Sequence, residues 1–371
     1  MTNRIKISVI MGAFLPVPAI QGGAVEILWF ELCEALAVKG IDITLISKKD
    51  PELLDNEKVN GINYIRVHGF KSVNFMPLRL TLDFIYSFFA VRRVRCSDVV
   101  ITNSFWSPIF AKLLTKSKIW VSVHRFPRNQ MRIYKHADVI QPVSHAVAQG
   151  IIEQSPCLKN KMCVIPNFVL KPDFKFELKK KRKTILYVGR LYPDKGLEGL
   201  IKSFSELCNT DFQDWKLIIV GPHEIKFGGG GDEYLKKLKK YAVRNIEFVG
   251  KVFNRTALNE YYKDSSIFVY PSLANKGEAF PLSPLEAMSY GCITIVLNLD
   301  CFKDYIVDGK NGFIVNGLNN KFDLKSSIKQ QMINYGSNEH LTIASESMTT
   351  ASKFSIDRVT NLIFAKLQGL L

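Results

Sequence analysis

The sequence predicts an α/β protein made of two doubly wound, Rossmann-like domains. Short β-rich runs alternate with helical segments along most of the 371 residues, which indicates parallel sheets covered by helices on both faces. The alternation stops near residue 168 and resumes at 184, and the length suits about two domains. We expect a first domain at 1–168, a linker at 169–183, a second domain at 184–352 and a last helical segment at 353–371.

The first half begins with "RIKISVIM" (4–11), a run typical of a strand, which a glycine-containing loop follows. A helix is expected over 23–40, because apolar residues from Val25 to Leu36 recur at helical spacing and Gly40 suits its end. Further strands of this domain are expected at 41–47, 62–68, 98–104, 119–124 and 138–144.

The segment 167–183, "NFVLKPDFKFELKKKRK", contains a proline and ends in five basic residues, which is typical of a linker. Ligands of open α/β sheets bind outside the carboxyl ends of the strands, so we expect the ligand in the crevice between the two domains. Strands of the second half are expected at 184–189, 215–221, 245–250, 266–272 and 292–297, and helices at 195–208 and 283–291.

The net charge of +16 is concentrated, because the window 60–135 holds many lysines and arginines but only Asp83 and Asp98 as acids. Such a field attracts phosphates, nucleic acid or an acidic membrane surface; the alternative is a soluble protein that is basic overall. The seven cysteines form no C-x-x-C pair, which predicts free thiols in a reducing compartment. No segment reaches the ~20 apolar residues of a membrane span, and no signal peptide is apparent, so we expect a cytoplasmic protein.

Several common cofactor motifs are missing from the sequence. It has no G-x-G-x-x-G after a strand, no G-x-x-x-x-G-K-[ST] loop, no H-E-x-x-H and no cluster of cysteines and histidines. It also has no D-x-D pair, so we expect no dedicated Mg²⁺ or Mn²⁺ clamp. These absences disfavour nicotinamide, flavin, P-loop and zinc chemistry.

The stretch "YVGRLYPDKGL" (187–197) places Arg190 and Lys195 on either side of a turn between a strand and a helix. At the mouth of a sheet a diphosphate would fit between them, since arginine offers a bidentate fork and lysine a mobile point charge. An exposed loop with two solvated charges is the alternative.

The stretch "GEAFPLSPLEAMSYG" (277–291) carries two glutamates, Glu278 and Glu286, around an expected helix start. One interpretation is structural: Ser283 is the N-cap and Glu286 closes a capping box. The other is functional, because free N–H groups at a helix start attract phosphate while carboxylates beside it accept hydrogen bonds from sugar hydroxyls. Together these groups describe a site for a sugar nucleotide.

At this point a resemblance is plain. "GEAFPLSPLEAMSYG" resembles the E-x(7)-E segment of the family-4 retaining glycosyltransferases, and "YVGRLYPDKGL" matches their G-R-x-x-x-x-K-G phosphate motif. In the first half, "QGGAVE" (21–26) resembles the family's glycine loop and "SVHRF" (122–126) its strand-end histidine. The resemblance implies the GT-B architecture, with two doubly wound domains facing a central cleft and a C-terminal helix that returns to the first domain. It also implies that no metal or other cofactor is needed.

The resemblance assigns roles residue by residue. Glu286 would bind the ribose hydroxyls of the donor, Glu278 the hydroxyls of its sugar, and Arg190 and Lys195 its diphosphate. His124 would lie near the transferred sugar. The remaining donor-binding positions implied are Gly22, Gly23, Gly189, Gly221, Val252, Phe280, Leu282 and Ser283. Backbone N–H groups near Phe280 and Leu282 would form a cradle for the diphosphate. Many family members have glycine at the position of Pro281, and proline has no N–H to offer a phosphate, so one donor of this cradle is expected to be missing.

The implied reaction moves a hexose or N-acetylhexosamine from a nucleoside-diphosphate sugar to a glycan or lipid-linked glycan acceptor. UDP is the favoured carrier of the sugar, and GDP-mannose is the alternative. The acceptor would belong to a cell-surface polysaccharide such as O-antigen, capsule or lipopolysaccharide. The segment 76–95 is apolar and ends in Arg92, Arg93 and Arg95, so it suits either a bilayer surface or an ordinary packed helix. A peripheral position on the inner face of the cytoplasmic membrane would follow from the first. The rival classes are a nucleic-acid-binding protein, which rests on charge alone, and an epimerase or phosphorylase of similar architecture.

Overall fold

The computed structural model of the chain describes residues 4–73, 75–170, 178, 181–252, 254–274, 277–316 and 321–371. The chain divides into two compact units. Unit 1 comprises Met1–Phe168 with Ile356–Leu371, and unit 2 comprises Val169–Ser355. Most of the expected linker at 169–183 lies outside the described residues.

Unit 1 is built on a seven-stranded sheet in the order β3-β4-β2-β1-β5-β6-β7. All neighbouring strands are parallel except β3, which pairs antiparallel with β4. The strands are β1 (Lys6–Ile10), β2 (Asp42–Lys48), β3 (Asn56–Val59), β4 (Ile62–Val67), β5 (Val99–Thr102), β6 (Lys118–Val123) and β7 (Val139–Pro142). The hairpin strand β3, mostly exposed and polar, has no counterpart among the strands expected from the sequence.

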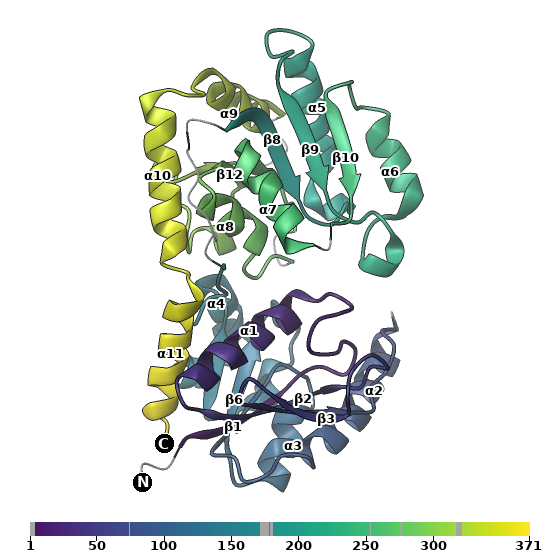
Figure 1. The fold of residues 1–371 in the computed structure, drawn as a ribbon, viewed down its shortest axis with the longest axis vertical. Helices are drawn as coiled ribbons and strands as arrows, with labels where there is room; N and C mark the ends of the chain where they lie inside the picture. The colour runs from purple at the N-terminus through teal and green to yellow at the C-terminus, as the bar shows by residue number, and fades with distance from the viewer. Residues whose placement is uncertain are drawn as a thin grey trace. The chain divides into compact units, whose positions relative to one another are not determined.

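The helices of unit 1 include the C-terminal one, α11, which packs beside α1 although the two are far apart in sequence (Figure 1). They are α1 (Ala24–Val38), α2 (Met76–Val91), α3 (Ser107–Leu114), α4 (His145–Gln154) and α11 (Ile356–Gln368), with short 3₁₀ turns at Met131–Tyr134 and Pro156–Lys161. The helix α1 ends as expected near Gly40, whose φ of 85° is the left-handed conformation that favours glycine.

Unit 2 has a six-stranded, wholly parallel sheet in the order β10-β9-β8-β11-β12-β13. Its central strands β11 and β12 are buried at every position, as the continuous apolar runs of a sheet covered on both faces require. The strands are β8 (Arg182–Val188), β9 (Lys216–Val220), β10 (Ile246–Gly250), β11 (Ser265–Tyr270), β12 (Ile293–Leu297) and β13 (Phe313–Val315).

Helices cover this second sheet as well (Figure 1): α5 packs beside α9, and α8 packs on α10. They are α5 (Leu197–Cys208), α6 (Gly231–Lys239), α7 (Arg255–Asp264), α8 (Leu282–Ser289), α9 (Lys321–Ile333) and α10 (Asn338–Ser352), with 3₁₀ turns at Pro193–Lys195, Ile225–Phe227 and Asp300–Phe302. The two doubly wound sheets confirm the fold class that the alternation of strands and helices predicts. No helix in the described parts of the chain is both long and apolar enough to span a bilayer.

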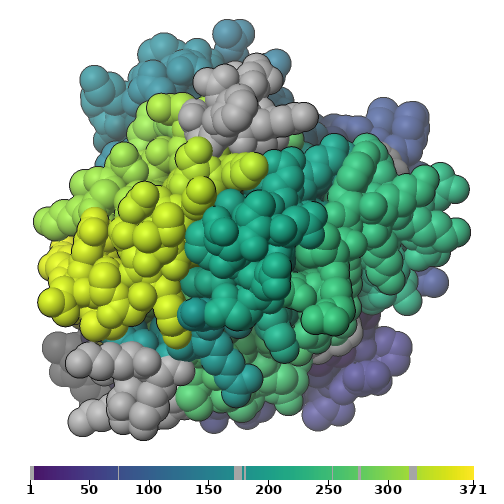
Figure 2. Space-filling model, turned by 90° about the horizontal axis from the view of Figure 1, so that it is seen from above, coloured from purple at the N-terminus to yellow at the C-terminus, as the bar shows by residue number. Residues whose placement is uncertain are grey.

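The junction of α9 and α10 packs against the beginning of the sheet of unit 2. The ring of Tyr335 meets that of Trp215 edge-on, with centroids 5.4 Å apart, and its hydroxyl donates to the carbonyl of Lys181. In the space-filling view of Figure 2, yellow residues of the C-terminal part of the chain lie directly against teal residues of unit 2. The strands begin at this end, and the loops that carry Gly189, Lys195 and Glu278 follow the strands at the opposite edge.

Candidate functional site

Bare backbone lies at the carboxyl ends of three neighbouring strands of unit 2. The N–H of Gly189, after β8, donates to Val220 at 3.0 Å, and the N–H of Gly221, after β9, donates to the carbonyl of Gly250 at 2.8 Å. A side chain at Gly221 would lie 1.9 Å from the carbonyl oxygen of Gly189, and its φ of 148° also favours glycine. Val252 follows this row, half-buried, just beyond the end of β10. A ligand can approach the backbone closely along such an edge.

Lys195 lies at the end of the loop that follows β8 and is only 6% exposed. Two features hold the loop against the one that follows β11. The N–H of Leu273 donates to the carbonyl of Asp194 at 2.7 Å. Gly196, with φ 69°, approaches Pro271 so closely that a Cβ would lie 2.0 Å from its carbonyl oxygen. Backbone contacts of the residues on either side of Lys195 therefore fix the position of this lysine.

Glu278 receives that lysine. Its Oε1 atom forms an ion pair with Lys195 and accepts hydrogen bonds from Tyr270 at 2.9 Å and Ser272 at 2.8 Å. Both partners of the pair are less than a tenth exposed. Breaking such a buried pair by removing one partner costs about 3–5 kcal/mol, because the other charge is left uncompensated. Three donors on one oxygen fix the direction of the carboxylate at the end of β11.

Glu286 is held as well, but at both of its carboxylate oxygens. Arg255 approaches Oε1 at 2.9 Å, and the hydroxyl of Tyr262 donates to Oε2 at 2.9 Å. The capping-box interpretation of Glu286 is wrong, because α8 begins at Leu282 with Pro281 as its N-cap and no side-chain cap. Ser283, interpreted there as the N-cap, lies inside the first turn. The carboxylate instead points toward α7.

The start of α8 offers few backbone donors. Proline occupies the N-cap, Pro281, and the third helical position, Pro284, so of the groups that a helix start leaves free only the N–H groups of Leu282 and Ser283 remain. The carbonyl of Pro281 accepts from the hydroxyl of Tyr305 at 3.1 Å. Phe280 is buried against Tyr305, with ring centroids 5.2 Å apart. The cradle is thus narrow but firmly anchored to the core.

Arg190 is exposed at the edge of the same loop. Its Nη1 donates to the carbonyl of Gly228 at 2.8 Å, and its guanidinium lies 6.0 Å from the ring centroid of Tyr192. The glycine run 228–231 makes this approach possible, since a Cβ at Gly228 would lie 2.6 Å from Nη1. The β9–α6 loop therefore positions the arginine, while the β11 loop positions Lys195.

In unit 1, two glycines precede α1. Gly22 has φ 83°, and Gly23, the N-cap of α1, has φ 117°. A Cβ at Gly23 would lie 2.2 Å from Oε2 of Glu26 and 2.8 Å from a methyl group of Leu15. Burial raises the pKa of Glu26 above its ordinary value. The positive φ values therefore favour glycine at both positions, and at Gly23 an added Cβ would also displace the side chains of Glu26 and Leu15.

His124 follows the end of β6 and is paired with Trp29 from α1. The indole N–H donates to Nε2 of the histidine at 3.1 Å, so the neutral ring carries its proton on Nδ1. Burial lowers the pKa of His124 to about 4, against an opposing contribution from the side chain of Asn167. At neutral pH this imidazole is uncharged with its acceptor nitrogen occupied, which suits a hydrogen-bond donor and not a general base.

Arg92, Arg93 and Arg95 are exposed just after α2, and Arg92 lies over the ring of Phe88, with the guanidinium 5.4 Å from the centroid. Their helix also exposes apolar side chains. Phe89 is 55% exposed and Ile85 40%, on a stripe that runs from Leu78 toward the arginines. At the end of α3, Leu113 is 72% exposed. The surface of α2 therefore combines uncovered apolar groups with a basic end.

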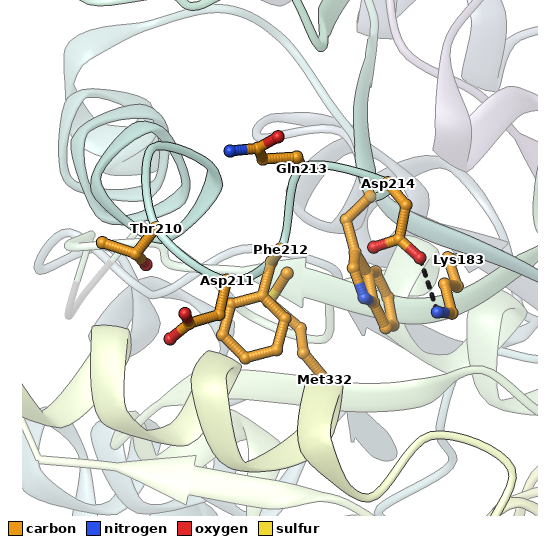
Figure 3. Close-up of a pocket in the computed structure, with 8 residues that line it drawn as sticks. Lys183, Thr210, Asp211, Phe212, Gln213, Asp214 and Met332 are labelled. Carbon is orange, nitrogen blue, oxygen red and sulfur yellow. Dashed lines mark hydrogen bonds and ion pairs between the residues drawn. The ribbon is translucent and has the colours of Figure 1, made fainter.

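A separate hollow lies at the other edge of the sheet of unit 2 (Figure 3). Lys183, near the start of β8, pairs with Asp214 at 2.5 Å, and Phe212 and Met332 form its floor. Apart from Met332, near the end of α9, its lining residues precede β9 or lie at the beginnings of β8 and β9, whereas Gly189 and Gly221 follow those strands. The hollow is thus remote from the two glutamates.

Several side chains of this constellation were not expected from the sequence: Arg255, Tyr262, Tyr270, Ser272 and Trp29. Tyr270 and Ser272 fall within the strand expected at 266–272, just before Glu278, so that strand was the signal. Arg255 and Tyr262 gave no local signal, because only the packing of α7 against α8 reveals their partner.

Comparison with known proteins agrees with these two halves. Residues 22–169 match the family model described as Glycosyltransferase Family 4, and residues 171–348 match the one described as Glycosyl transferases group 1. Spore coat protein SA of Bacillus subtilis is 26% identical, over 85% of this chain and 86% of its own length. A lipopolysaccharide 1,2-N-acetylglucosaminetransferase of Salmonella typhimurium is 28% identical, over 35% of this chain and 34% of its own.

Solved structures share the whole fold at lower identity. Sucrose-phosphate synthase from Thermosynechococcus elongatus superposes with a TM-score of 0.80 at 18% identity, over 99% of both chains. HepE from Anabaena, solved with UDP and glucose, superposes with a TM-score of 0.75 at 16% identity, over 99% of this chain and 100% of its own. The chain therefore belongs to the family-4 glycosyltransferases with the GT-B fold.

Proposed function

We propose that this glycosyltransferase is a metal-independent, retaining hexosyltransferase that uses a nucleoside-diphosphate sugar. The observation that carries the proposal is the pair of clamped carboxylates, Glu278 and Glu286, on either side of the start of α8, with Lys195 bound to the first. Carboxylates accept hydrogen bonds from hydroxyls, and the ammonium and helix start attract phosphate. One ligand that meets all these groups carries a sugar, a diphosphate and a ribose.

In this proposal each group acts on one part of the donor. Glu286 accepts from the ribose hydroxyls and Glu278 from those of the sugar. Lys195, Arg190 and the N–H groups of Leu282 and Ser283 meet the diphosphate. Gly22 and Gly23 leave space for the donor at unit 1, and His124 donates from Nδ1 to a sugar oxygen. Gly189, Gly221 and Val252 line the place of the base.

The chemical step follows from the charges. The bond between the anomeric carbon and the phosphate oxygen breaks, and its electron pair goes to the diphosphate. Lys195 and Arg190 stabilise the negative charge that develops there, and this electrostatic contribution is often the largest in catalysis. The acceptor oxygen bonds to the anomeric carbon on the face that the leaving group vacates, and its proton goes to the leaving phosphate. This course retains the anomeric configuration.

The donor sugar is proposed to be carried by UDP, in keeping with HepE, which was solved with UDP and glucose. GDP-mannose is the alternative within the same fold. A thermal-shift screen of UDP-glucose, UDP-galactose, UDP-N-acetylglucosamine and GDP-mannose, repeated in EDTA, tests both the donor and metal independence. We expect a rise in Tm with one UDP-sugar in EDTA, and hydrolysis of that donor. A shift with DNA or RNA and none with any nucleotide sugar would favour the nucleic-acid-binding class.

The acceptor is proposed to be a glycan or lipid-linked glycan of a cell-surface polysaccharide, as the name of the Salmonella relative suggests. The surface of α2 supports a peripheral position on an anionic membrane, because its apolar stripe would enter the headgroup region while Arg92, Arg93 and Arg95 meet acidic lipids. Each such basic residue contributes about 1 kcal/mol near an anionic surface.

Co-sedimentation with vesicles containing phosphatidylglycerol tests this position. We expect salt-sensitive binding that is lost when Arg92, Arg93 and Arg95 are changed to glutamine. The matched control changes three exposed lysines of unit 2, Lys236, Lys239 and Lys240, to glutamine, which removes the same charge from another surface. Equal loss of binding in both triple variants would show a general effect of charge and contradict a docking surface on α2.

A further inference from the structure

Arg255 forms a link between α7 and the carboxylate of Glu286 that no motif assigns. Nη2 of the arginine lies 2.9 Å from Oε1, and this is the ion pair that holds Glu286, whose side chain is 11% exposed while that of Arg255 is 43% exposed. An exposed ion pair contributes little, but a pair with one buried partner is screened much less. The pair therefore influences how the carboxylate is oriented.

A single helix supplies both donors to Glu286. Arg255 is the first residue of α7, and Tyr262, fully buried, lies seven residues later on the same face. Asn254 caps this helix by accepting from the N–H of Ala257 at 3.1 Å, which fixes the place where Arg255 begins. Tyr262 stacks on Tyr290, with centroids 5.8 Å apart, just beyond the end of α8. Both donors to the Glu286 carboxylate therefore come from α7, a helix whose position is fixed at both of its ends.

The two contacts leave acceptor positions of the Glu286 carboxylate available to a ligand. A carboxylate offers about four acceptor positions, and Arg255 and Tyr262 use one on each oxygen. Among the contacts of the described residues, each oxygen then keeps one acceptor position that neither donor uses. Two neighbouring hydroxyl groups, as on a ribose, match that arrangement.

We propose that Arg255 is a positioning residue for the ribose of the donor: it fixes Glu286 so that its two oxygens face the 2′- and 3′-hydroxyl groups together. The proposal rests on the function proposed above. Arg255 itself does not touch the nucleotide in this proposal. Its removal should therefore weaken the recognition of the diol and leave the reacting groups in place.

The test measures binding of UDP and 2′-deoxy-UDP by calorimetry to the full chain. The wild type should bind UDP about tenfold more tightly than 2′-deoxy-UDP, the scale of one lost hydrogen bond to a charged group. In Arg255→Gln, UDP binding should weaken about tenfold and the preference over 2′-deoxy-UDP should nearly vanish. With the donor sugar, KM should rise and kcat should change little. Arg255→Lys, which keeps the charge but not the fork, should recover part of the preference.

The matched control is Lys263→Gln on the same helix, which removes an equal charge from a surface pair with Glu260 and should leave both affinities unchanged. If Arg255→Gln still preferred UDP over 2′-deoxy-UDP about tenfold, the effects of the substitution and of the missing hydroxyl on the binding free energy would be additive. That result would overturn the positioning role while leaving the donor site intact. Failure of the folded wild type to bind UDP or GDP would instead overturn the proposed function, and the positioning role with it. Tm values of all variants show that each is folded.

Discussion

The ends of the two sheets that carry the predicted site residues are built by different physical means. In unit 2 the site is made of opposite charges held against each other, Lys195 with Glu278 and Arg255 with Glu286. In unit 1 the corresponding groups are kept uncharged or bare: His124 is neutral because burial lowers its pKa to about 4, and Gly22 and Gly23 present only backbone. Unit 2 therefore offers fixed charges for a polar ligand, whereas unit 1 offers shape and hydrogen-bond donors.

This contrast has a consequence for how each site depends on its surroundings. An ion pair orients charged groups before the ligand arrives, so less reorganisation is needed during the reaction. A neutral histidine in a buried position is oriented by hydrogen bonds, of which the one from Trp29 at 3.1 Å comes from the neighbouring helix α1. Variants in unit 2 should therefore act mainly on chemistry and donor binding, and variants in unit 1 on orientation.

The largest effect is expected at the cations of unit 2. Lys195→Ala and Arg190→Ala should each lower kcat by about 10²–10³-fold, because charge on the leaving diphosphate is no longer stabilised. Steady-state kinetics with the donor identified by thermal shift measures this. The two variants should differ in stability, since Lys195 is buried in an ion pair and Arg190 is exposed.

The stability difference calls for a control. Lys195→Ala leaves Glu278 buried without its cation and should cost about 3–5 kcal/mol, so low activity alone would be ambiguous. The double variant Lys195→Gln with Glu278→Gln removes both charges and should recover much of the Tm while activity stays low. Recovery of activity together with Tm would show that Lys195 acts only on folding.

The same contrast explains what the sequence could predict. In unit 2 the motifs are local: Gly189 to Gly196 and Glu278 to Glu286 each lie within one loop or helix start, so spacing alone predicted their common edge of the sheet. The partners of the carboxylates come from elsewhere, Arg255 and Tyr262 from α7, and such contacts depend on packing. Sequence rules also misplaced the start of α8, because Pro284 fits the first helical position as well as the third that it occupies. In unit 1, nothing local linked Trp29 to His124, which are 95 residues apart.

A smaller but substantial effect on stability and donor binding is expected from a change at Gly196, whose backbone contact fixes the position of Lys195. Gly196→Ala places a Cβ 2.0 Å from the carbonyl oxygen of Pro271 in a residue with φ 69°. Strain of this kind costs about 1–3 kcal/mol, and relief requires the two loops to separate. We expect a lower Tm and a weaker response to the donor. Gly309→Ala is a matched control, since it has a similar φ of 71° but no atom within 4 Å of the added carbon. Equal loss of donor binding in both variants would contradict a specific role for the contact with Pro271.

Unit 1 can be tested at the hydrogen bond between Trp29 and His124. Trp29→Phe removes the N–H that Nε2 of His124 accepts and should cost about 1–3 kcal/mol, the penalty of leaving a buried acceptor unpaired. Trp120→Phe, on β6, removes a similar buried bond to Gln141 at 2.9 Å. Both variants should lose Tm to a similar extent, but only Trp29→Phe should also lower kcat/KM, by about tenfold. Equal catalytic loss in both variants would show that His124 needs no orienting partner.

The smallest expected effect is the response of the two units to acid. His340 in unit 2 is buried and its pKa is lowered to about 4, so its contribution to stability is lost as pH falls from the ordinary histidine value toward 4. In unit 1 the same loss from His124 is opposed by Asp83, whose pKa burial raises to about 6; that carboxyl contributes stability at low pH which is lost as pH rises through 6.

We therefore expect acidification from about pH 7 to pH 5 to weaken unit 2 by about 1–2 kcal/mol and unit 1 by less. Hydrogen exchange of the core strands β12 and β5, corrected for the intrinsic effect of pH, measures the two units in one experiment. Asp83→Asn should remove the opposing contribution and make unit 1 as sensitive to acid as unit 2. His340→Gln should flatten the response of unit 2. Equal sensitivity of the units in the wild type would mean that Asp83, which accepts from the N–H groups of Phe105 and Trp106 at 3.1 Å, stays ionised in spite of its burial.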